Sequence, residues 1–272
     1  MPELAELKTT ADYINYHSKP SKGPATHYCN IIKNPVHKCM DVDITKGLFS
    51  MSAESRGKEL IVYIHESGKT TPIRFTMGMS GYFKVTNTGH EPKHAHLKFY
   101  RKDGTTLSFV DVRRFGKWKV GESWSSNRGP DPTTEVEKFK NNIWDNIDKR
   151  AFDKDIHLML MNQQYFNGIG NYLRAEILYR LPHVNPFMNA REVIQNHPEI
   201  LDLCTEIPMK AYVLAGGSVT SKEDPFKNYK EKSENLIKCY HNPRMSWCMD
   251  KNKRRFWFDP LWYDVYLEKY GA

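Results

Sequence analysis

The 272-residue chain has no long apolar run and few cysteines, and each absence narrows the class of protein. No stretch approaches the roughly 18 apolar residues that span a membrane. Acidic residues interrupt the first ten positions and no apolar segment follows, so the N-terminus does not resemble a signal peptide. The cysteines are odd in number and widely scattered: Cys29, Cys39, Cys204, Cys239 and Cys248. This pattern argues against a disulfide framework and predicts reduced thiols in an intracellular compartment.

Acidic residues are also fewer than basic ones. Forty lysines and arginines face 32 aspartates and glutamates, which gives a formal net charge of +8. Such a balance favours a polyanionic partner, because each neutralised phosphate releases condensed counterions. The hydrophobic share of 39% and the aromatic share of 12% exclude a disordered chain. The length allows two domains of ordinary size.

The first half of the chain is rich in predicted strands. Residues 1–16 show apolar positions at helical spacing, but the period changes to two from about Asp41. The alternating or β-branched runs are ELIVYIH (59–65), PIRFTM (72–77), HAHLKFY (94–100) and TTLSFVDV (105–112). Asp103-Gly104 between the last two is a strong hairpin signal. We therefore predict a β-sandwich over residues 1–124, with one helix at its start.

The second half is predicted to be helical. A polar, proline-bearing stretch at 125–135 is interpreted as a linker, and residues 136–272 form the second domain. Helical patterns follow in VEKFKNNIWDNI (136–147), DIHLMLMNQQYF (155–166) and NYLRAEILYRL (171–181). Near the end, KCYHN (238–242) and RRFWFD (254–259) could pair as a hairpin. The fold class is therefore α+β.

Two motifs fit contact with nucleic acid, and each has an ordinary alternative. In NGIGN (167–171) a glycine turn precedes a helix whose N-terminus can receive a phosphate, although an ordinary helical hairpin has the same spacing. In VDVRRFGKW (110–118) two arginines and a phenylalanine follow a strand. They could read bases and intercalate, or form a basic strand end with a core aromatic residue.

Two other motifs are assigned no ligand. Gly68-Lys69-Thr70 resembles the end of a phosphate-binding loop, but Tyr63 stands where that motif requires glycine, so a hairpin turn is expected. Cys239, His241 and Cys248 suggest a zinc finger, but no second close ligand pair follows. The segment 251–258 is then a metal-free, basic and aromatic hairpin suited to a nucleic-acid backbone.

Taken in order, these motifs resemble one family. The start M-P-E-x-x-E, RGKEL, VDVRRFG, NGIGNYLRAEILYR and the C-terminal finger segment resemble the Fpg/Nei DNA glycosylases over nearly the whole chain. The sequences of these motifs are most similar to those of the animal endonuclease VIII-like enzymes, whose finger hairpin lacks zinc. The resemblance implies a β-sandwich, a helical domain with a helix–two-turn–helix motif, and a zincless finger at about 236–260. DNA is expected to bind between the domains.

The resemblance also assigns the catalytic residues. It implies that Pro2, exposed after removal of Met1, is the nucleophile and that Glu3 is the general acid/base. An α-amino group titrates near 8 and lysine near 10.4, so far more of a terminal amine is unprotonated at neutral pH. Glu6 is expected to position the terminus, although Ala5 stands where the family often has proline. Lys58 is expected to contact a phosphate beside the lesion.

The remaining assignments concern DNA contacts. The resemblance implies that Met79, Arg113 and Phe115 fill the gap left by a flipped nucleotide. Arg114 and Asn171 are expected to meet phosphates, as is Arg254 in the finger. The segment 216–226 resembles a loop that closes over the flipped base. Its Ser218 departs from the lysine of the animal relatives, which leaves base selectivity open.

The leading hypothesis is a bifunctional DNA glycosylase and AP lyase for oxidised bases. Oxidised pyrimidines, hydantoins and formamidopyrimidines are the implied lesions, in duplex, single-stranded or bubble DNA. Strand cleavage would follow by β- or β,δ-elimination. A damaged-DNA-binding protein without chemistry is the alternative. We expect a monomer that needs no metal or cofactor, located in the nucleus if the source is eukaryotic; a viral source is also open.

Overall fold

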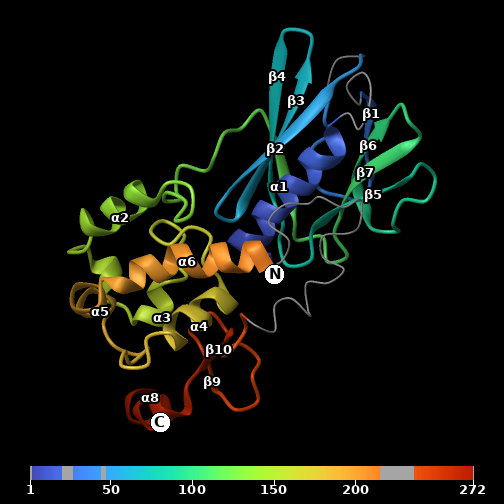
Figure 1. Cartoon of the computed structure of the whole chain (residues 1–272). Coiled ribbons are helices and arrows are strands. Elements are labelled where there is room, and N and C mark those ends of the chain that lie inside the picture. Colours follow the sequence, from blue (N-terminus) through green and yellow to red (C-terminus); the bar gives the residue numbers. More distant parts are fainter. Residues whose placement is uncertain (1, 20–26, 44–46, 215–235, 272) are drawn as a thin grey trace. The chain divides into compact units, whose positions relative to one another are not determined.

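A computed structural model describes residues 2–19, 27–43, 47–214 and 236–271 of the chain (Figure 1). The described residues divide into two compact units, one ending at Ser125 and the other beginning at Ser126. Each unit has its own core and is described separately below.

The first unit is built from two four-stranded antiparallel sheets. One sheet has the order β1-β6-β7-β5 and the other has the order β2-β3-β4-β8. The strands are β1 (Tyr28–Lys33), β2 (Ser50–Arg56), β3 (Glu59–Glu66), β4 (Lys69–Thr76), β5 (Tyr82–Asn87), β6 (Ala95–Arg101), β7 (Thr105–Val110) and β8 (Lys117–Val120). The predicted runs at 59–65, 72–77, 94–100 and 105–112 correspond to β3, β4, β6 and β7.

The two sheets enclose one apolar core, so the predicted sandwich is confirmed. Phe75 of one sheet and Phe109 of the other lie with ring centroids 5.4 Å apart, and both are fully buried. The predicted N-terminal helix is α1 (Leu4–Ser18), which packs mainly against β2. The Asn15 side chain accepts from the backbone N–H of Ala53 at 2.7 Å and donates to its carbonyl at 2.8 Å. These two bonds tie α1 to the middle of β2.

Tight turns join the strands where glycine permits a positive φ. Gly57 (φ 57°) and Lys58 connect β2 to β3, and Gly57 takes the first central position, as type II′ loops require. Ser67 and Gly68 connect β3 to β4, which confirms that the GKT motif is a hairpin turn. Gly104 (φ 81°) closes the predicted hairpin between β6 and β7.

The second unit is mainly helical and carries a short hairpin. Its helices are α2 (Val136–Trp144), η1 (Arg150–Asp153), α3 (Ile156–Met159), α4 (Asn171–Tyr179), α5 (Ala190–Asn196), α6 (Glu199–Leu214), η2 (Pro260–Trp262) and α8 (Tyr263–Tyr270). Strands β9 (Ser246–Met249) and β10 (Arg255–Phe258) pair antiparallel. Together with the sandwich, this arrangement confirms the predicted α+β class.

Two predictions within the second unit need correction. The helix expected over 155–166 is only the single turn α3. Asn162 then accepts the Gln164 N–H through its side chain, and such local bonds compete with a helix. The finger strand is SWCM (246–249) and not KCYHN, which forms turns in the structure. The backbone N–H groups of Lys238, Cys239 and Tyr240 donate to the Glu176 carboxylate instead of to a strand.

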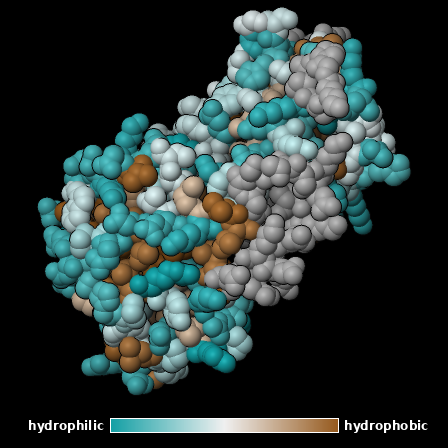
Figure 2. Space-filling view, in the orientation of Figure 1, coloured by the Kyte–Doolittle hydropathy of each residue, from teal (hydrophilic) through white to brown (hydrophobic). Residues whose placement is uncertain are grey.

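Hydrophilic residues cover much of the face drawn in Figure 2, with a few hydrophobic patches on the helical unit. Among the described residues, none of the helices has the length and hydropathy needed to cross a membrane.

Candidate functional site

The start of the chain is held firmly in the first unit. Glu3 is the N-cap of α1 and is only 2% exposed. Its backbone N–H donates to Glu6 Oε2 at 2.8 Å, and the two glutamates form a capping box. Glu6 is also buried, and its carbonyl accepts from Thr10 Oγ1 at 2.7 Å. Pro2, which is half-buried, is therefore attached to a fixed helix start.

Lys58 lies in the turn between β2 and β3. Glu3 precedes Asn15 by 12 residues, about 18 Å of helix, and Lys58 follows Ala53 by five residues, about 17 Å of strand. The Asn15–Ala53 bonds join the helix and the strand between these points. In Figure 1 the start of α1 and the β2–β3 turn lie toward the same end of the unit. The fold thus directs Lys58 and the terminus to one end of the sandwich.

Elsewhere in the first unit, two loops that are distant in the sequence lie next to each other. The loop between β4 and β5 carries Met79, and the loop after β7 carries Arg113 and Phe115. At Gly78 (φ 62°) an added Cβ would stand 2.6 Å from the Gly116 nitrogen. Only glycine allows this approach. The two loops are in backbone contact as a result.

Asp111 holds the second of these loops in place. Its carboxylate is buried and accepts from Ser80 Oγ, from the Arg113 N–H at 3.2 Å and from the Gly116 N–H at 2.7 Å. Burial alone would raise the pKa of Asp111, but these hydrogen bonds, with one from the Phe115 backbone, lower it below its usual value. The carboxylate therefore stays ionised and organises the loop around itself.

The two loops present their large side chains to solvent. Met79 is 47% exposed and Phe115 is 54% exposed, while the Arg113 guanidinium lies 4.8 Å from the centre of the Phe115 ring. Arg114 adopts a positive φ of 55°, which is rare for a residue with a side chain. Two exposed apolar side chains and a stacked arginine thus lie on adjoining loops, and we call this group the wedge.

A pocket of about 730 Å³ opens beside this wedge. It is lined by residues 36–39 on one side and residues 113–117 on the other. Four cationic side chains line it, namely Lys38, Arg113, Arg114 and Lys117. This concentration of positive charge suits an anionic group such as a phosphate.

In the second unit, the NGIGN turn is supported from within. The Gln163 side chain accepts from the Gly168 N–H at 3.0 Å and donates to the Ile169 carbonyl at 2.9 Å. Gly168 has a φ of 98°, and the buried Asn167 donates to the Gly129 carbonyl at 2.8 Å. The turn therefore fixes the direction of α4, whose first residue is Asn171.

Asn171 connects α4 to the finger hairpin. Its Nδ2 donates to the Arg255 carbonyl at 2.8 Å, and its Oδ1 accepts from Arg174 Nη2 at 2.6 Å. Arg174 is fully buried and pairs with the buried Asp250 at 2.8 Å. Asp250 in turn accepts from the backbone N–H of Arg254 at 3.0 Å. The predicted residues Asn171 and Arg254 thus belong to one hydrogen-bonded network.

The pKa of Asp250 also reflects this network. Burial would raise it, but the Arg254 N–H and the Arg174 guanidinium lower it below its usual value. Sequence reasoning assigned no role to Asp111, Arg174, Glu176 or Asp250. The first three lie inside quoted motifs, but their contacts are with distant or backbone groups. Nothing in their spacing could reveal those contacts.

The finger cysteines are buried thiols. Burial raises the pKa of Cys239, and it raises the pKa of Cys248 to about 12. Among the described residues, the one group of three close metal-ligand side chains lies elsewhere, at His183, His197 and Glu199. Ser218 and the predicted loop 216–226 lie outside the described residues.

Comparisons with known proteins agree on one family. Residues 1–118 match the model of the formamidopyrimidine-DNA glycosylase N-terminal domain. Human Endonuclease 8-like 1 is 34% identical, with 95% of this chain and 72% of the relative covered. Formamidopyrimidine-DNA glycosylase from Prochlorococcus marinus is 28% identical, over 81% of this chain and 82% of that protein.

The fold also matches solved structures. Formamidopyrimidine-DNA glycosylase from Lactococcus lactis, non-covalently bound to DNA containing an AP site, superimposes with a TM-score of 0.74. That match has 20% identity and covers 95% of this chain and 98% of the other. A structure of MutM in complex with DNA containing carbocyclic 8-oxo-G gives a TM-score of 0.73 at 22% identity.

Proposed function

Because this chain belongs to the Fpg/Nei family of DNA glycosylases, we propose that it excises oxidised bases from DNA through a Schiff base at Pro2. The chain is a DNA glycosylase and AP lyase of base excision repair, and its partner is damaged DNA. The observation that carries the proposal is the match with Endonuclease 8-like 1 over 95% of the chain. The fixed Pro2-Glu3 terminus at the start of α1 supports it.

The proposed chemistry begins at the Pro2 nitrogen after Met1 is removed. The nitrogen bonds to C1′ of the deoxyribose while the bond from C1′ to the base breaks and the base leaves with a proton. The C1′–O4′ bond then opens as O4′ is protonated, which leaves an iminium ion. This cation acidifies the C2′ proton, so β-elimination can expel the 3′ phosphate. A second elimination can release the remaining sugar.

Glu3, Glu6 and Lys58 assist this sequence in the proposal. Glu3 delivers the proton to O4′, because its carboxyl group follows the nucleophile directly in the chain. Glu6 accepts the Glu3 N–H and keeps the terminus in position. Lys58 neutralises a phosphate beside the lesion from the β2–β3 turn.

The wedge supports nucleotide flipping. Extrusion of the damaged nucleotide leaves a gap in the stack, at a cost of a few kcal/mol. Met79 and Phe115 can fill this gap with apolar surface, and the stacked Arg113 can hydrogen-bond to the orphaned base. Arg114 and the basic pocket beside it would hold a phosphate of the same DNA.

The finger and α4 are proposed to form a second set of contacts with the DNA backbone. Asn171 and Arg254 are proposed to contact phosphates, and the Arg174–Asp250 pair keeps them in register. Since one Asn171 amide hydrogen already binds the Arg255 carbonyl, its contact to DNA would use the second hydrogen.

Oxidised pyrimidines, hydantoins and formamidopyrimidines are the lesion classes proposed, in duplex, single-stranded or bubble DNA. The protein would act as a monomer within the cell, and in the nucleus if its source is eukaryotic.

Trapping with borohydride tests the central step. Wild-type protein should form a covalent adduct with an oligonucleotide containing thymine glycol or an abasic site, because borohydride reduces the iminium ion. Pro2→Thr should form no adduct and retain most of its DNA affinity. Pro92→Thr, a matched change away from the terminus, should trap like the wild type.

Two outcomes would contradict the proposal. Equal trapping by Pro2→Thr and wild type would place the nucleophile elsewhere. Tight binding to damaged DNA without any adduct would favour the non-catalytic alternative.

For the phosphate role, Lys58→Ala should reduce trapping, whereas Lys69→Ala at the opposite β3–β4 turn should not.

A further inference from the structure

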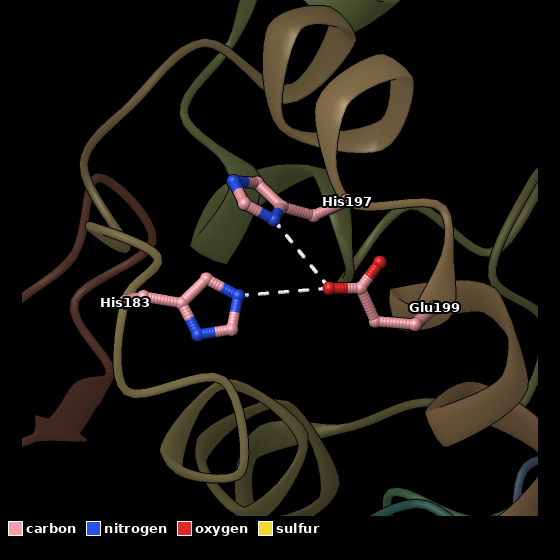
Figure 3. Close-up of side chains that lie close together, drawn as sticks. All are labelled: His183, His197 and Glu199. Atoms are coloured by element: carbon pink, nitrogen blue, oxygen red, sulfur yellow. Dashed lines mark ion pairs between the residues drawn. The ribbon is translucent and has the colours of Figure 1, made fainter.

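Three metal-ligand side chains converge on the surface of the helical unit. They are His183 in the segment after α4, His197 at the C-cap of α5 and Glu199 at the first position of α6. Figure 3 shows both imidazole rings directed toward the same carboxylate oxygen. His183 Nε2 lies 3.6 Å from Glu199 Oε1, and His197 Nδ1 lies 3.4 Å from it.

Both separations are ion-pair distances that also match the spacing of ligands around a metal ion. Ligands about 2.0–2.1 Å from a tetrahedral Zn²⁺ stand about 3.3 Å apart, close to both observed values. The three donor atoms all lie within 4.8 Å of one another, so small rotations of the side chains would complete the shell.

The backbone around the cluster is already fixed. The His197 N–H donates to the Val193 carbonyl at 2.8 Å, and the His197 carbonyl accepts from the Ile200 N–H at 3.1 Å. Val184, which follows His183, is buried and its N–H donates to Leu181. The ligands therefore extend from anchored positions, and little main-chain ordering would be needed on binding.

The donor types favour a transition metal. Two imidazoles and one carboxylate are a common zinc ligand set, with water in the fourth position. Mg²⁺ and Ca²⁺ prefer shells of oxygen atoms.

We propose that His183, His197 and Glu199 bind one Zn²⁺ ion on the surface of the helical unit. The ion would link the segment after α4, the end of α5 and the start of α6. None of these residues belongs to the proposed catalytic or DNA-contacting set, so the site does not depend on the proposed reaction.

Equilibrium dialysis of the full chain against Zn²⁺ tests this site. Wild-type protein should bind one more ion than each of three variants, His183→Ala, His197→Ala and Glu199→Gln. Loss of one ligand should weaken binding at this site by at least about tenfold. His90→Ala removes an exposed histidine in the other unit and should bind as the wild type does. Equal zinc content in the wild type and all three variants would overturn the proposal.

Substitution with Co²⁺ identifies the ligands independently of any loss of folding. Wild-type protein should show visible d–d bands without the near-ultraviolet charge-transfer bands that thiolate ligands produce. His183→Ala, an exposed position, should lose the d–d bands while its circular dichroism spectrum is unchanged. Thiolate bands that persist in His183→Ala would assign the ion to cysteines and would contradict the proposed site.

Discussion

The wedge loop of the first unit and the finger loop of the second use the same construction. In each, an aspartate directly follows a strand, Asp111 after β7 and Asp250 after β9. Each buried carboxylate accepts backbone N–H groups from the next few residues. Each loop also contains one residue with a positive φ, Arg114 at 55° and Lys253 at 57°.

The two loops differ in how the buried charge is balanced. Asp111 is held by the Ser80 hydroxyl and by backbone N–H groups, all of them neutral. Asp250 is paired with the buried guanidinium of Arg174, which also binds Asn171 and the His157 carbonyl. Neutral hydrogen-bond donors order the wedge loop, whereas an ion pair couples the finger to α4. Loss of one partner should therefore reduce the stability of the protein more at the ion pair.

Arg174→Met should have the largest effect on stability. It leaves the Asp250 charge buried without its partner, which typically costs about 3–5 kcal/mol. Urea unfolding monitored by circular dichroism measures the change. Lys140→Met is the control, because Lys140 and Asp202 form an exposed pair at 2.7 Å and such pairs contribute only about 0–1 kcal/mol. Equal losses in the two variants would contradict the importance of the buried pair.

Asp111→Asn should have a smaller effect, because its partners are neutral. The amide retains one acceptor but presents N–H₂ to a backbone donor, and an unsatisfied group costs about 1–3 kcal/mol. Amide hydrogen exchange should accelerate at Arg113 and Gly116 while residues 251–258 are unchanged. Asp103→Asn, where the carboxylate accepts the Thr105 N–H in an exposed turn, should change little. Faster exchange throughout both loops would contradict a local role for Asp111.

The two loops should also respond differently to acid. Burial lowers the pKa of His157, which stacks on Phe256 of the finger, to about 4. In the unfolded chain this residue binds a proton near pH 6.5, so stability falls as the pH drops from about 6.5 to 4. The loss between pH 7 and pH 5 should be about 2 kcal/mol. The lowered pKa of Asp111 contributes stability that is lost only below about pH 4.

Urea unfolding at pH 7, 6 and 5 measures this difference. His157→Gln should remove most of the slope, because glutamine does not titrate, whereas the exposed His90→Gln should retain it. Hydrogen exchange at pH 5 should increase first at residues 255–258 and not at residues 111–116. An unchanged slope in His157→Gln would exclude this histidine as the cause.

The sequence predicted the sandwich and α1 because these depend on local patterns, whereas Met79, Arg113 and Phe115 were assigned by the family resemblance. Period-two runs identify β3, β6 and β7, and VDVRRFG identifies the loop that exposes Phe115. The prediction that KCYHN pairs with β10 was wrong, because Glu176, more than 60 residues away, holds that segment in turns. Asp250 was missed for the same reason, since its role depends on Arg174, which is 76 residues distant.

Lys253→Gly should have the smallest effect on stability, since the lysine side chain that it removes is exposed and the change relieves an unfavourable backbone conformation. A positive φ costs a residue with a side chain about 1–2 kcal/mol, and the added freedom of glycine in the unfolded chain offsets about 0.5–1 kcal/mol. The variant should therefore gain about 0–1.5 kcal/mol in urea unfolding and bind DNA nearly as the wild type does. Arg114→Gly should gain similarly in stability but lose affinity for damaged DNA, because it also removes a proposed phosphate contact. If both variants bound DNA equally well, the distinction between a structural position in the finger and a contact position in the wedge would be wrong.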